Sequence, residues 1–306
     1  MRKDSIYYRQ VQLLVRVLPL LDSEKCFALK GGTAINLFYR PMPRLSVDID
    51  LLYLPSHGRT EALLNIRAAL TRLSALIRKT IKGIQIQNTH EQSDALRLIL
   101  QLADVRIKVE LSPVIRGTVF PPEKMEVNAL VEKEFGYAEI QVASLPDLYA
   151  GKICAALDRQ HPRDLFDVKY LLENEGFTED LRKTFLVFLI SHQRPMSELL
   201  SPNRKDIRET FVAEFSQMTE DEVTVEDLEA TREQLIEIIH SNMSSDERNF
   251  LLSFKARNPT WELLGLSNFE EVSNLPSVQW KLINLTNMDN VKHKEAYQKL
   301  EKVLLF

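Results

Sequence analysis

The chain has 306 residues, of which 44% are hydrophobic and 27% charged, a composition typical of a globular protein with one large or two ordinary domains. No window approaches the roughly 18 apolar residues of a membrane span, and charges interrupt the N-terminal residues too often for a signal peptide. We therefore expect a cytoplasmic protein without a membrane partner.

The formal charge of -4 is unevenly distributed along the chain. Residues 1–170 carry 24 Lys and Arg against 19 Asp and Glu, whereas residues 171–306 carry 15 Lys and Arg against 24 Asp and Glu. Phosphate attraction would favour the N-terminal half if nucleic acid binds, although a solvated surface explains the same bias.

The two cysteines, Cys26 and Cys154, lie in or beside apolar stretches and show no spacing typical of metal ligands. This pattern excludes a disulfide framework and a zinc site. We expect both thiols to lie in the core.

Helical and strand-like patterns alternate through the first part of the chain. Apolar side chains at helical spacing predict a helix over residues 5–22. In residues 30–38, a turn of two glycines leads into a second short apolar helix. In residues 45–54, apolar and polar side chains instead alternate with a period of two, which is typical of a half-buried strand. A covering amphipathic helix is expected over residues 60–81.

Two further strands are expected over residues 95–103 and 105–111, separated by a tight turn. An irregular stretch over 112–134 and a short strand over 138–142 follow, and from there the pattern is mostly helical. The sequence therefore predicts an α+β protein with an α/β domain over residues 1–143 and a helical domain over 144–306.

The polar face of the strand over residues 45–54 carries two acids. Asp48 and Asp50 are two residues apart and emerge on one face about 7 Å apart along the strand, close enough to hold one or two divalent cations. A third carboxylate on a neighbouring strand usually supplements such a pair, and Glu110 lies on the polar face of its own strand. Taken alone, two acids in this spacing are more often simply solvated.

The segment Gly31-Gly32-Thr33 ends fifteen residues ahead of Asp48. Gly31 and Gly32 precede the short helix, so their backbone amides can approach a triphosphate, and the hydroxyl of Thr33 can donate to the same phosphates. Taken alone, the glycine pair is an ordinary turn. Lys30, which precedes it, could be only a charged residue at the end of a strand. Beside the acidic strand, the combination favours a nucleotide and Mg²⁺.

Two separated motifs resemble the AbiEii/AbiGii and MenT family of nucleotidyltransferase toxins, which have a polymerase-beta-like fold. The first is Lys30-Gly-Gly-Thr33 followed by Arg44-Leu-Ser46-Val-Asp48-Ile-Asp50-Leu51. The second begins at Leu145-Pro-Asp147 and continues through Lys152 and Asp158-Arg159 to Arg163-Asp164-Leu-Phe-Asp167. The resemblance covers about residues 26–175. It implies a mixed sheet with flanking helices in the first domain and a helical second domain that contributes to the active site.

The resemblance also implies roles for individual residues. Asp48 and Asp50 would bind one or two Mg²⁺ ions and Ser46 would lie beside the nucleotide phosphates. Lys152 and Asp167 would complete the catalytic set, with Lys152 and Arg163 near the triphosphate. From the residues alone, Asp167 could hold Lys152 in place or act as a base, and Arg163 could instead belong to an intrahelical salt-bridge set with its acidic neighbours.

The family further implies a function in bacterial toxin–antitoxin and phage-defence systems. We expect transfer of a nucleoside monophosphate from an NTP to RNA, notably the 3′ end of tRNA, which would block translation, and a cognate antitoxin as partner. The expected covering helix offers basic side chains for RNA or merely a solvated face: Arg67, Arg72, Arg78, Lys79 and Lys82. Transfer to a protein or small molecule, or a non-catalytic binding role, are the alternatives.

Overall fold

The computed structural model describes residues 5–88 and 96–305, and the chain divides into two compact units. Unit 1 comprises Met1–Ser144 together with a short return segment, Met218–Asp221. Unit 2 comprises Leu145–Gln217 and Glu222–Phe306. The division near Ser144 lies beside the boundary expected from the sequence, but the return segment was not foreseen.

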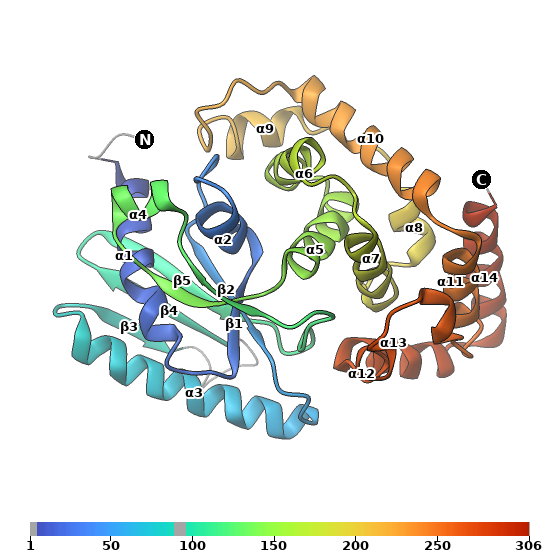
Figure 1. The fold of residues 1–306 in the computed structure, drawn as a ribbon, viewed down its shortest axis with the longest axis horizontal. Coiled ribbons are helices and arrows are strands. Elements are labelled where there is room, and N and C mark those ends of the chain that lie inside the picture. Colours follow the sequence, from blue (N-terminus) through green and yellow to red (C-terminus); the bar gives the residue numbers. More distant parts are fainter. Residues whose placement is uncertain (1–4, 89–95, 306) are drawn as a thin grey trace. The chain divides into compact units, whose positions relative to one another are not determined.

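A mixed sheet forms the centre of unit 1 (Figure 1). Its seven described strands follow the order β3-β4-β5-β2-β1-β7-β6. β1 pairs parallel with β7, β2 pairs parallel with β5, and the remaining neighbours are antiparallel. The strands are β1 (Phe27–Lys30), β2 (Asp48–Tyr53), β3 (Gln85–Asn88), β4 (Leu96–Leu102), β5 (Val105–Leu111), β6 (Glu123–Glu126) and β7 (Glu139–Val142).

Helices α1 (Ile6–Leu21) and α3 (Arg59–Thr80) pack on the sheet, α1 against β5 and α3 against β4. Ile49 and Val109, which are fully buried, point to the apolar face of the sheet. Because successive side chains of a strand point to opposite faces, the acidic residues of β2 and β5 lie on the other face. The remaining helical segments of unit 1 are α2 (Gly31–Ala34), which continues into the π-helical turn η1 (Ile35–Tyr39), and α4 (Ala129–Phe135).

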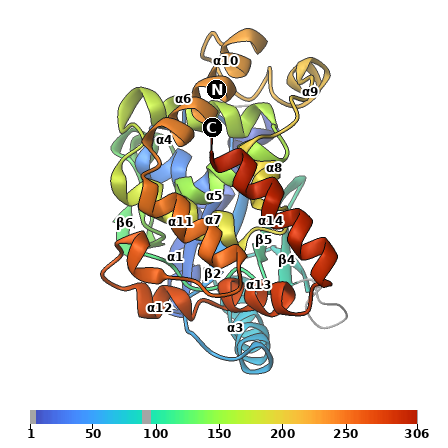
Figure 2. The same cartoon turned by 90° about the vertical axis from the view of Figure 1, so that its right-hand side faces the viewer.

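The described residues of unit 2 form helices joined by loops (Figure 2). Its centre is α5, which packs against α6 and α7, and its buried aromatic rings include Phe166 against Phe215. The helices are α5 (Leu145–Asp158), α6 (Pro162–Asn174), α7 (Glu179–Ser191), α8 (Met196–Leu200), α9 (Arg208–Glu214), α10 (Val225–Asn242), α11 (Ser245–Lys255), the 3-10 turn η2 (Trp261–Leu264), α12 (Phe269–Ser273), α13 (Pro276–Thr286) and α14 (Asn290–Leu304).

Most elements predicted from periodicity are confirmed, and the expected α+β class with a mixed sheet is the observed one. The prediction for residues 112–134 was wrong, because this stretch contains β6 and α4. β3 was also missed, and Ala95, the expected start of β4, lies outside the described residues.

Within residues 5–88 and 96–305, no helix combines the length and the apolar character that crossing a bilayer requires. Both cysteines are free thiols, Cys154 fully inside the core and Cys26 only partly buried. Burial raises the pKa of the Cys154 thiol, so this side chain behaves as an inert core group.

Candidate functional site

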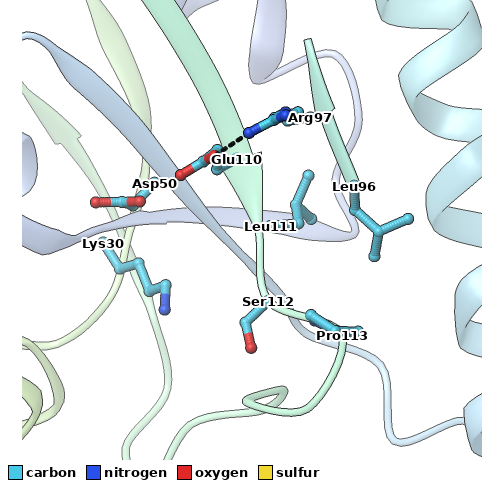
Figure 3. Close-up of a pocket in the computed structure, with 8 residues that line it drawn as sticks. All are labelled: Lys30, Asp50, Leu96, Arg97, Glu110, Leu111, Ser112 and Pro113. Carbon is cyan, nitrogen blue, oxygen red and sulfur yellow. Dashed lines mark ion pairs between the residues drawn. The ribbon is translucent and has the colours of Figure 1, made fainter. Parts of the chain in front are cut away.

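A row of four charged side chains crosses unit 1 on the polar face of the sheet (Figure 3). Strand register pairs Lys30 with Asp50, Asp50 with Glu110, and Glu110 with Arg97. The order of charges along the row is therefore positive, negative, negative, positive. Burial lowers the pKa of the Lys30 ammonium, and the negative charge of Asp50 opposes this effect. Asp50 thus lies between a partly buried cation and a second carboxylate.

Lys108 lies two residues before Glu110 on β5, and the strand register pairs it with Asp48. Its Nζ is 3.0 Å from Glu110 Oε2 and 3.9 Å from Asp48 Oδ1. Burial alone would lower the pKa of Lys108, but its hydrogen bond to Glu110 and the nearby aspartates raise it. A second oxygen of the same carboxylate, Glu110 Oε1, lies 3.7 Å from Arg97 Nη1. The third carboxylate expected as a metal ligand is thus engaged by cations of the protein.

In the described part of the chain, no group of three or more His, Cys, Asp or Glu side chains is arranged to hold a metal ion. Asp48 and Asp50 nevertheless fit Mg²⁺, which is usually held by one or two carboxylates together with substrate phosphates and water. The side chain of Asp48 is 53% exposed, which leaves room for such additional ligands. The binding of Mg²⁺ by these carboxylates, and by Glu110 as a third ligand, therefore stays a prediction.

The glycine turn lies directly beside this acidic strand. Gly31 has φ +76°, and a Cβ added there would lie 2.6 Å from Asp50 Oδ2. A Cβ added at Gly32 would lie 2.7 Å from the Arg44 guanidinium and 2.9 Å from Ser46 Oγ. Only glycine allows the backbone to approach these polar groups so closely. The turn is therefore built to bring backbone amides next to a carboxylate, a guanidinium and a hydroxyl.

Thr33 connects the turn to the acidic strand. Its side chain is 1% exposed, its hydroxyl donates to the carbonyl oxygen of Asp48, and its Oγ1 lies 3.0 Å from Ser46 Oγ. Direct donation to a phosphate, expected from the sequence, would require the first of these bonds to break. Arg44, which is 4% exposed, was given no role from the sequence although it lies within the first motif. Its position against Gly32 makes it part of this site.

The second motif forms a buried ion cluster in unit 2. Lys152 Nζ lies 2.8 Å from Asp164 Oδ1 and 3.0 Å from Asp167 Oδ2, and the three side chains are 8%, 0% and 2% exposed. Arg159 binds Asp164 through two guanidinium nitrogens. Although burial would raise the pKa of the Asp164 carboxyl, Lys152 and Arg159 hold it below its usual range. Asp167 holds the lysine as one interpretation foresaw, but the closer partner, Asp164, was not singled out.

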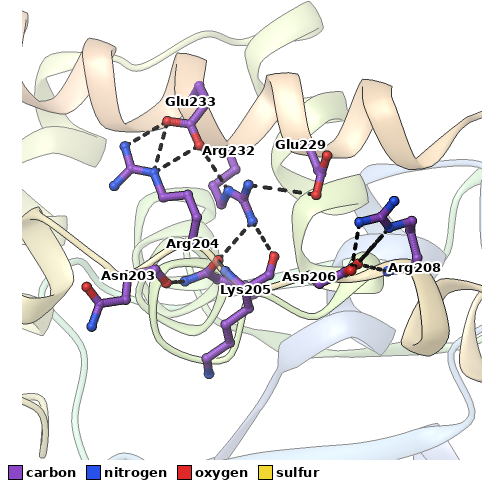
Figure 4. A network of polar contacts seen from close by, with 9 residues as sticks. Asn203, Arg204, Lys205, Asp206, Arg208, Glu229, Arg232 and Glu233 are labelled. Carbon is purple, nitrogen blue, oxygen red and sulfur yellow. Dashed lines mark hydrogen bonds and ion pairs between the residues drawn. The ribbon is translucent and has the colours of Figure 1, made fainter.

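The loop between α5 and α6 carries Arg159 and is fixed by a polar network, whose partners Asn203, Lys205 and Arg232 are labelled in Figure 4. Gln160 has φ +54° and is 1% exposed. Its amide nitrogen donates to the Asn203 carbonyl oxygen at 2.8 Å, and its Oε1 accepts from the Lys205 backbone amide and the Arg232 guanidinium, each at 3.0 Å. The network ties the loop to the segment before α9 and to α10.

Arg163 lies in the first turn of α6. The His161 side chain accepts a hydrogen bond from the Arg163 backbone amide and lies 3.0 Å from Glu214. His161 is therefore a helix cap, which agrees with its omission from the predicted site. The salt-bridge set suggested for Arg163 and its acidic neighbours is replaced by pairing of these acids with Lys152.

The basic face of α3 is partly engaged within the protein. Arg72 forms two hydrogen bonds of 2.7 Å to the Glu24 carboxylate, and Arg78 donates to the carbonyl oxygen of Ile86. Lys79 and Lys82 are exposed. A contribution of α3 to RNA binding stays a prediction, and its exposed lysines are the better candidates.

The mixed sheet with an acidic strand beside a glycine turn defines the nucleotidyltransferase class of fold. MenT4, a nucleotidyltransferase toxin from Mycobacterium tuberculosis H37Rv, shares this fold with a TM-score of 0.62 and 17% identity, and the alignment covers 89% of this chain and 93% of that chain. A protein of H. pylori described as a nucleotidyltransferase aligns with a TM-score of 0.45 and 18% identity over 76% of this chain and 94% of that chain. No protein with curated function matches the chain.

The chain belongs to the family of AbiEii nucleotidyl transferase toxins of type IV toxin–antitoxin systems, whose family model matches residues 12–282. The resemblance noted in the sequence is thereby confirmed, and the enzyme class is that of a nucleotidyltransferase. The matched region includes both motifs and extends beyond residue 175, where the resemblance seen in the sequence ended.

Proposed function

We propose that this enzyme transfers a nucleoside monophosphate from an NTP to the 3′ end of an RNA, with tRNA as the acceptor, in a reaction that requires Mg²⁺. The observation that carries the proposal is the pair Asp48 and Asp50 on one strand face, beside a glycine turn whose close approach admits no side chain. Such an arrangement offers hard oxygen ligands next to backbone donors for phosphates.

In this proposal the triphosphate lies along the glycine turn. The amides of Gly31 and Gly32 and the hydroxyl of Ser46 donate to phosphate oxygens, while the Arg44 guanidinium beside Gly32 adds positive charge. Thr33 holds the turn against the start of β2. We further propose that Lys152, which Asp164 and Asp167 hold in place, and Arg163 in the first turn of α6 are required for the transfer.

The reaction is an in-line displacement at the α-phosphorus. The acceptor oxygen forms a bond to this phosphorus while the bond to the β-phosphate oxygen breaks, so pyrophosphate leaves. Asp48 and Asp50 would hold Mg²⁺, which would supply Lewis-acid stabilisation of the phosphate charge. Glu110, whose register places it beside Asp50, accepts the proton of the attacking hydroxyl. Lys108 neutralises Glu110 and Asp48 before substrates bind.

A modified 3′ end cannot be aminoacylated, so this activity would stop translation and growth. An antitoxin encoded with the enzyme would prevent the damage, as the family to which the chain belongs implies. We propose these consequences from the chemistry of the acceptor end and from the family.

Transfer is tested by incubating the full chain with total tRNA, Mg²⁺ and each α-³²P-labelled NTP in turn, followed by denaturing gels. We expect label on tRNA with the wild type and none with Asp48→Asn, which keeps the shape of the side chain but removes its charge. Asp104→Asn is the matched control, because Asp104 is an exposed aspartate at the opposite end of β5, paired only with Arg9 among the described contacts. It should label tRNA like the wild type.

Label on protein or on a small molecule, with none on tRNA, would replace the proposed acceptor while preserving the transferase chemistry. Equal labelling by the wild type and Asp48→Asn would refute the assignment of the acidic strand. Growth arrest on induction in cells, lost in Asp48→Asn and retained in Asp104→Asn, would separate a toxic enzyme from a binding protein.

A further inference from the structure

A pocket of about 290 Å³ adjoins the charged row on the polar face of the sheet. Figure 3 shows Lys30 and Ser112 on one side of it, and the leucine side chains of β4 and β5 on the other. Its lining residues come from β1, β2, β4, β5 and the turn after β5: Lys30, Asp50, Leu96, Arg97, Glu110, Leu111, Ser112 and Pro113. The pocket lies wholly within unit 1.

The glycine turn and the pocket meet at Asp50, which lines the pocket and whose Oδ2 lies 2.6 Å from the Cβ position of Gly31. From Asp50 they extend toward different ends of the acidic strand. Ser46, beside Gly32, precedes Asp48 and Asp50 in the chain, whereas the pocket is lined by Asp50 and by residues after the end of the parallel strand β5. With its pyrophosphate toward Gly32 and Ser46, a triphosphate on the glycine turn would direct its leaving group away from the pocket. In-line displacement places the attacking group opposite the leaving group. The attacking hydroxyl then approaches from the pocket.

The lining suits one nucleoside. Pro113, with the edges of the buried Leu96 and Leu111, offers an apolar contact for a base, while the Ser112 hydroxyl and the Lys30 ammonium can donate to ribose or base oxygens. Arg97 can pair with the phosphate that precedes the terminal nucleoside, since its side chain is 42% exposed. The volume is at the lower end of the roughly 300–1,000 Å³ typical of small-molecule sites, so it holds a single residue of an RNA chain.

We propose that this pocket binds the terminal nucleoside of the acceptor RNA, with Arg97 on its 5′ phosphate and the apolar contact against its base. The inference rests on the proposed nucleotide transfer and assigns the acceptor subsite within it. Glu110, which lines the pocket, then lies next to the attacking 3′-hydroxyl.

Binding without reaction tests the assignment. Fluorescence anisotropy of the full chain would follow a labelled oligoribonucleotide with the sequence of a tRNA 3′ end and a 3′-deoxy terminus, and the same oligonucleotide with an abasic terminal residue. Arg97→Met removes the proposed phosphate contact. Arg106→Met is the matched control, because Arg106 is an exposed arginine on the neighbouring strand β5 that does not line the pocket. A non-hydrolysable NTP is titrated in parallel.

We expect Arg97→Met, and separately the loss of the terminal base, to weaken oligonucleotide binding about tenfold. The affinity for the NTP analogue should stay within about twofold, and Arg106→Met should change neither affinity. Photocrosslinking of an oligonucleotide ending in 4-thiouridine should label the peptides that contain Leu96–Arg97 or Leu111–Pro113. This second measurement does not depend on any variant.

Weaker binding of the NTP analogue alone in Arg97→Met would assign the pocket to the nucleoside of the NTP and overturn the proposal. Unchanged binding of both ligands, or crosslinks confined to other segments, would also overturn it. These results are distinct from failure of the proposed function, which is seen as absence of label on tRNA, because the binding measurements require no transfer.

Discussion

Two clusters in which one lysine contacts two carboxylates differ in their access to water. On β2 and β5, the carboxylates of Asp48 and Glu110 share Lys108, and their side chains are 53%, 34% and 35% exposed. In unit 2, Lys152, Asp164 and Asp167 pack together with side chains that are 8%, 0% and 2% exposed, and Arg159, which also binds Asp164, is 50% exposed. Exposed ion pairs contribute little to stability and exchange their partners easily, whereas breaking a buried pair is costly. The first cluster is suited to accept a new cation, and the second is suited to keep a lysine in place.

The largest expected effect comes from breaking the buried cluster. Lys152→Met leaves the carboxylates of Asp164 and Asp167 without their common cation in the interior, so we expect a loss of about 3–5 kcal/mol in the free energy of unfolding. Chemical denaturation with urea measures this. Lys108→Met, the equivalent change in the exposed cluster, should cost less than about 1 kcal/mol. Equal losses for the two variants would contradict the comparison.

Gly31→Ala tests how closely the turn approaches the acidic strand. The new methyl group would have to displace Asp50 Oδ2 from 2.6 Å, and φ +76° is unfavourable for alanine, so we expect a loss of about 1–3 kcal/mol in stability and of most transfer activity. Gly176→Ala is the control, because Gly176 has φ +72° but open space around its Cβ position. It should lose stability through backbone strain alone and keep its activity. Loss of activity in both variants would count against a specific role of the Gly31 contact.

Acid should weaken the buried cluster through Asp164. Its pKa lies below the ordinary carboxyl value because Lys152 and Arg159 outweigh the effect of burial. The unfolded chain therefore binds more protons than the folded one at acid pH. The stabilisation is complete above the unfolded pKa of about 3.9 and is lost as the pH falls through that value toward the folded pKa. Unfolding free energies measured from pH 7 to pH 3 should fall less steeply for Asp164→Asn than for the wild type. Parallel curves would exclude this contribution.

The smallest effect concerns the affinity for divalent cations. Lys108→Met removes the ammonium that competes with a metal ion for Asp48, so we expect Mn²⁺, used as a paramagnetic probe, to bind several times more tightly. Electron paramagnetic resonance of free Mn²⁺ measures this without turnover. Arg106→Met, which removes a cation elsewhere on β5, should leave the affinity unchanged. Weaker Mn²⁺ binding in Lys108→Met would show that the lysine supports the site instead of competing for it.

The sequence was informative where burial imposes a period on the side chains. The alternation of Ile49 with Asp48 and Asp50 predicted β2 and the face of its acids, because one face of that strand is buried. β6 was missed because it is a short strand with no buried residue, so no apolar period marks it. Such strands form through pairing with a neighbour, which no local pattern reveals.

The same reasoning explains which candidate site residues the sequence singled out. Asp48, Asp50 and Lys152 stand at informative spacings within the two motifs. Asp164 was not singled out, because an acid in the first turn of a helix is usually solvated, and only the tertiary fold buries it against Lys152. The contact between Lys108 and Glu110 was missed for a comparable reason, since strand register alone does not show it.

The short return segment gives the first unit an unusual dependence on a distant part of the chain. The backbone amide of Leu45 donates to the carbonyl oxygen of Met218, the Thr219 hydroxyl donates to the carbonyl oxygen of Pro43, and Arg44 forms a bridge with Thr219. These contacts lie immediately before the acidic strand. A fragment ending at residue 144 would lack them, so unit 1 is not a separable module in sequence. Expression, proteolysis and domain-exchange experiments should therefore treat residues 43–45 and 218–219 as neighbours that must be kept together.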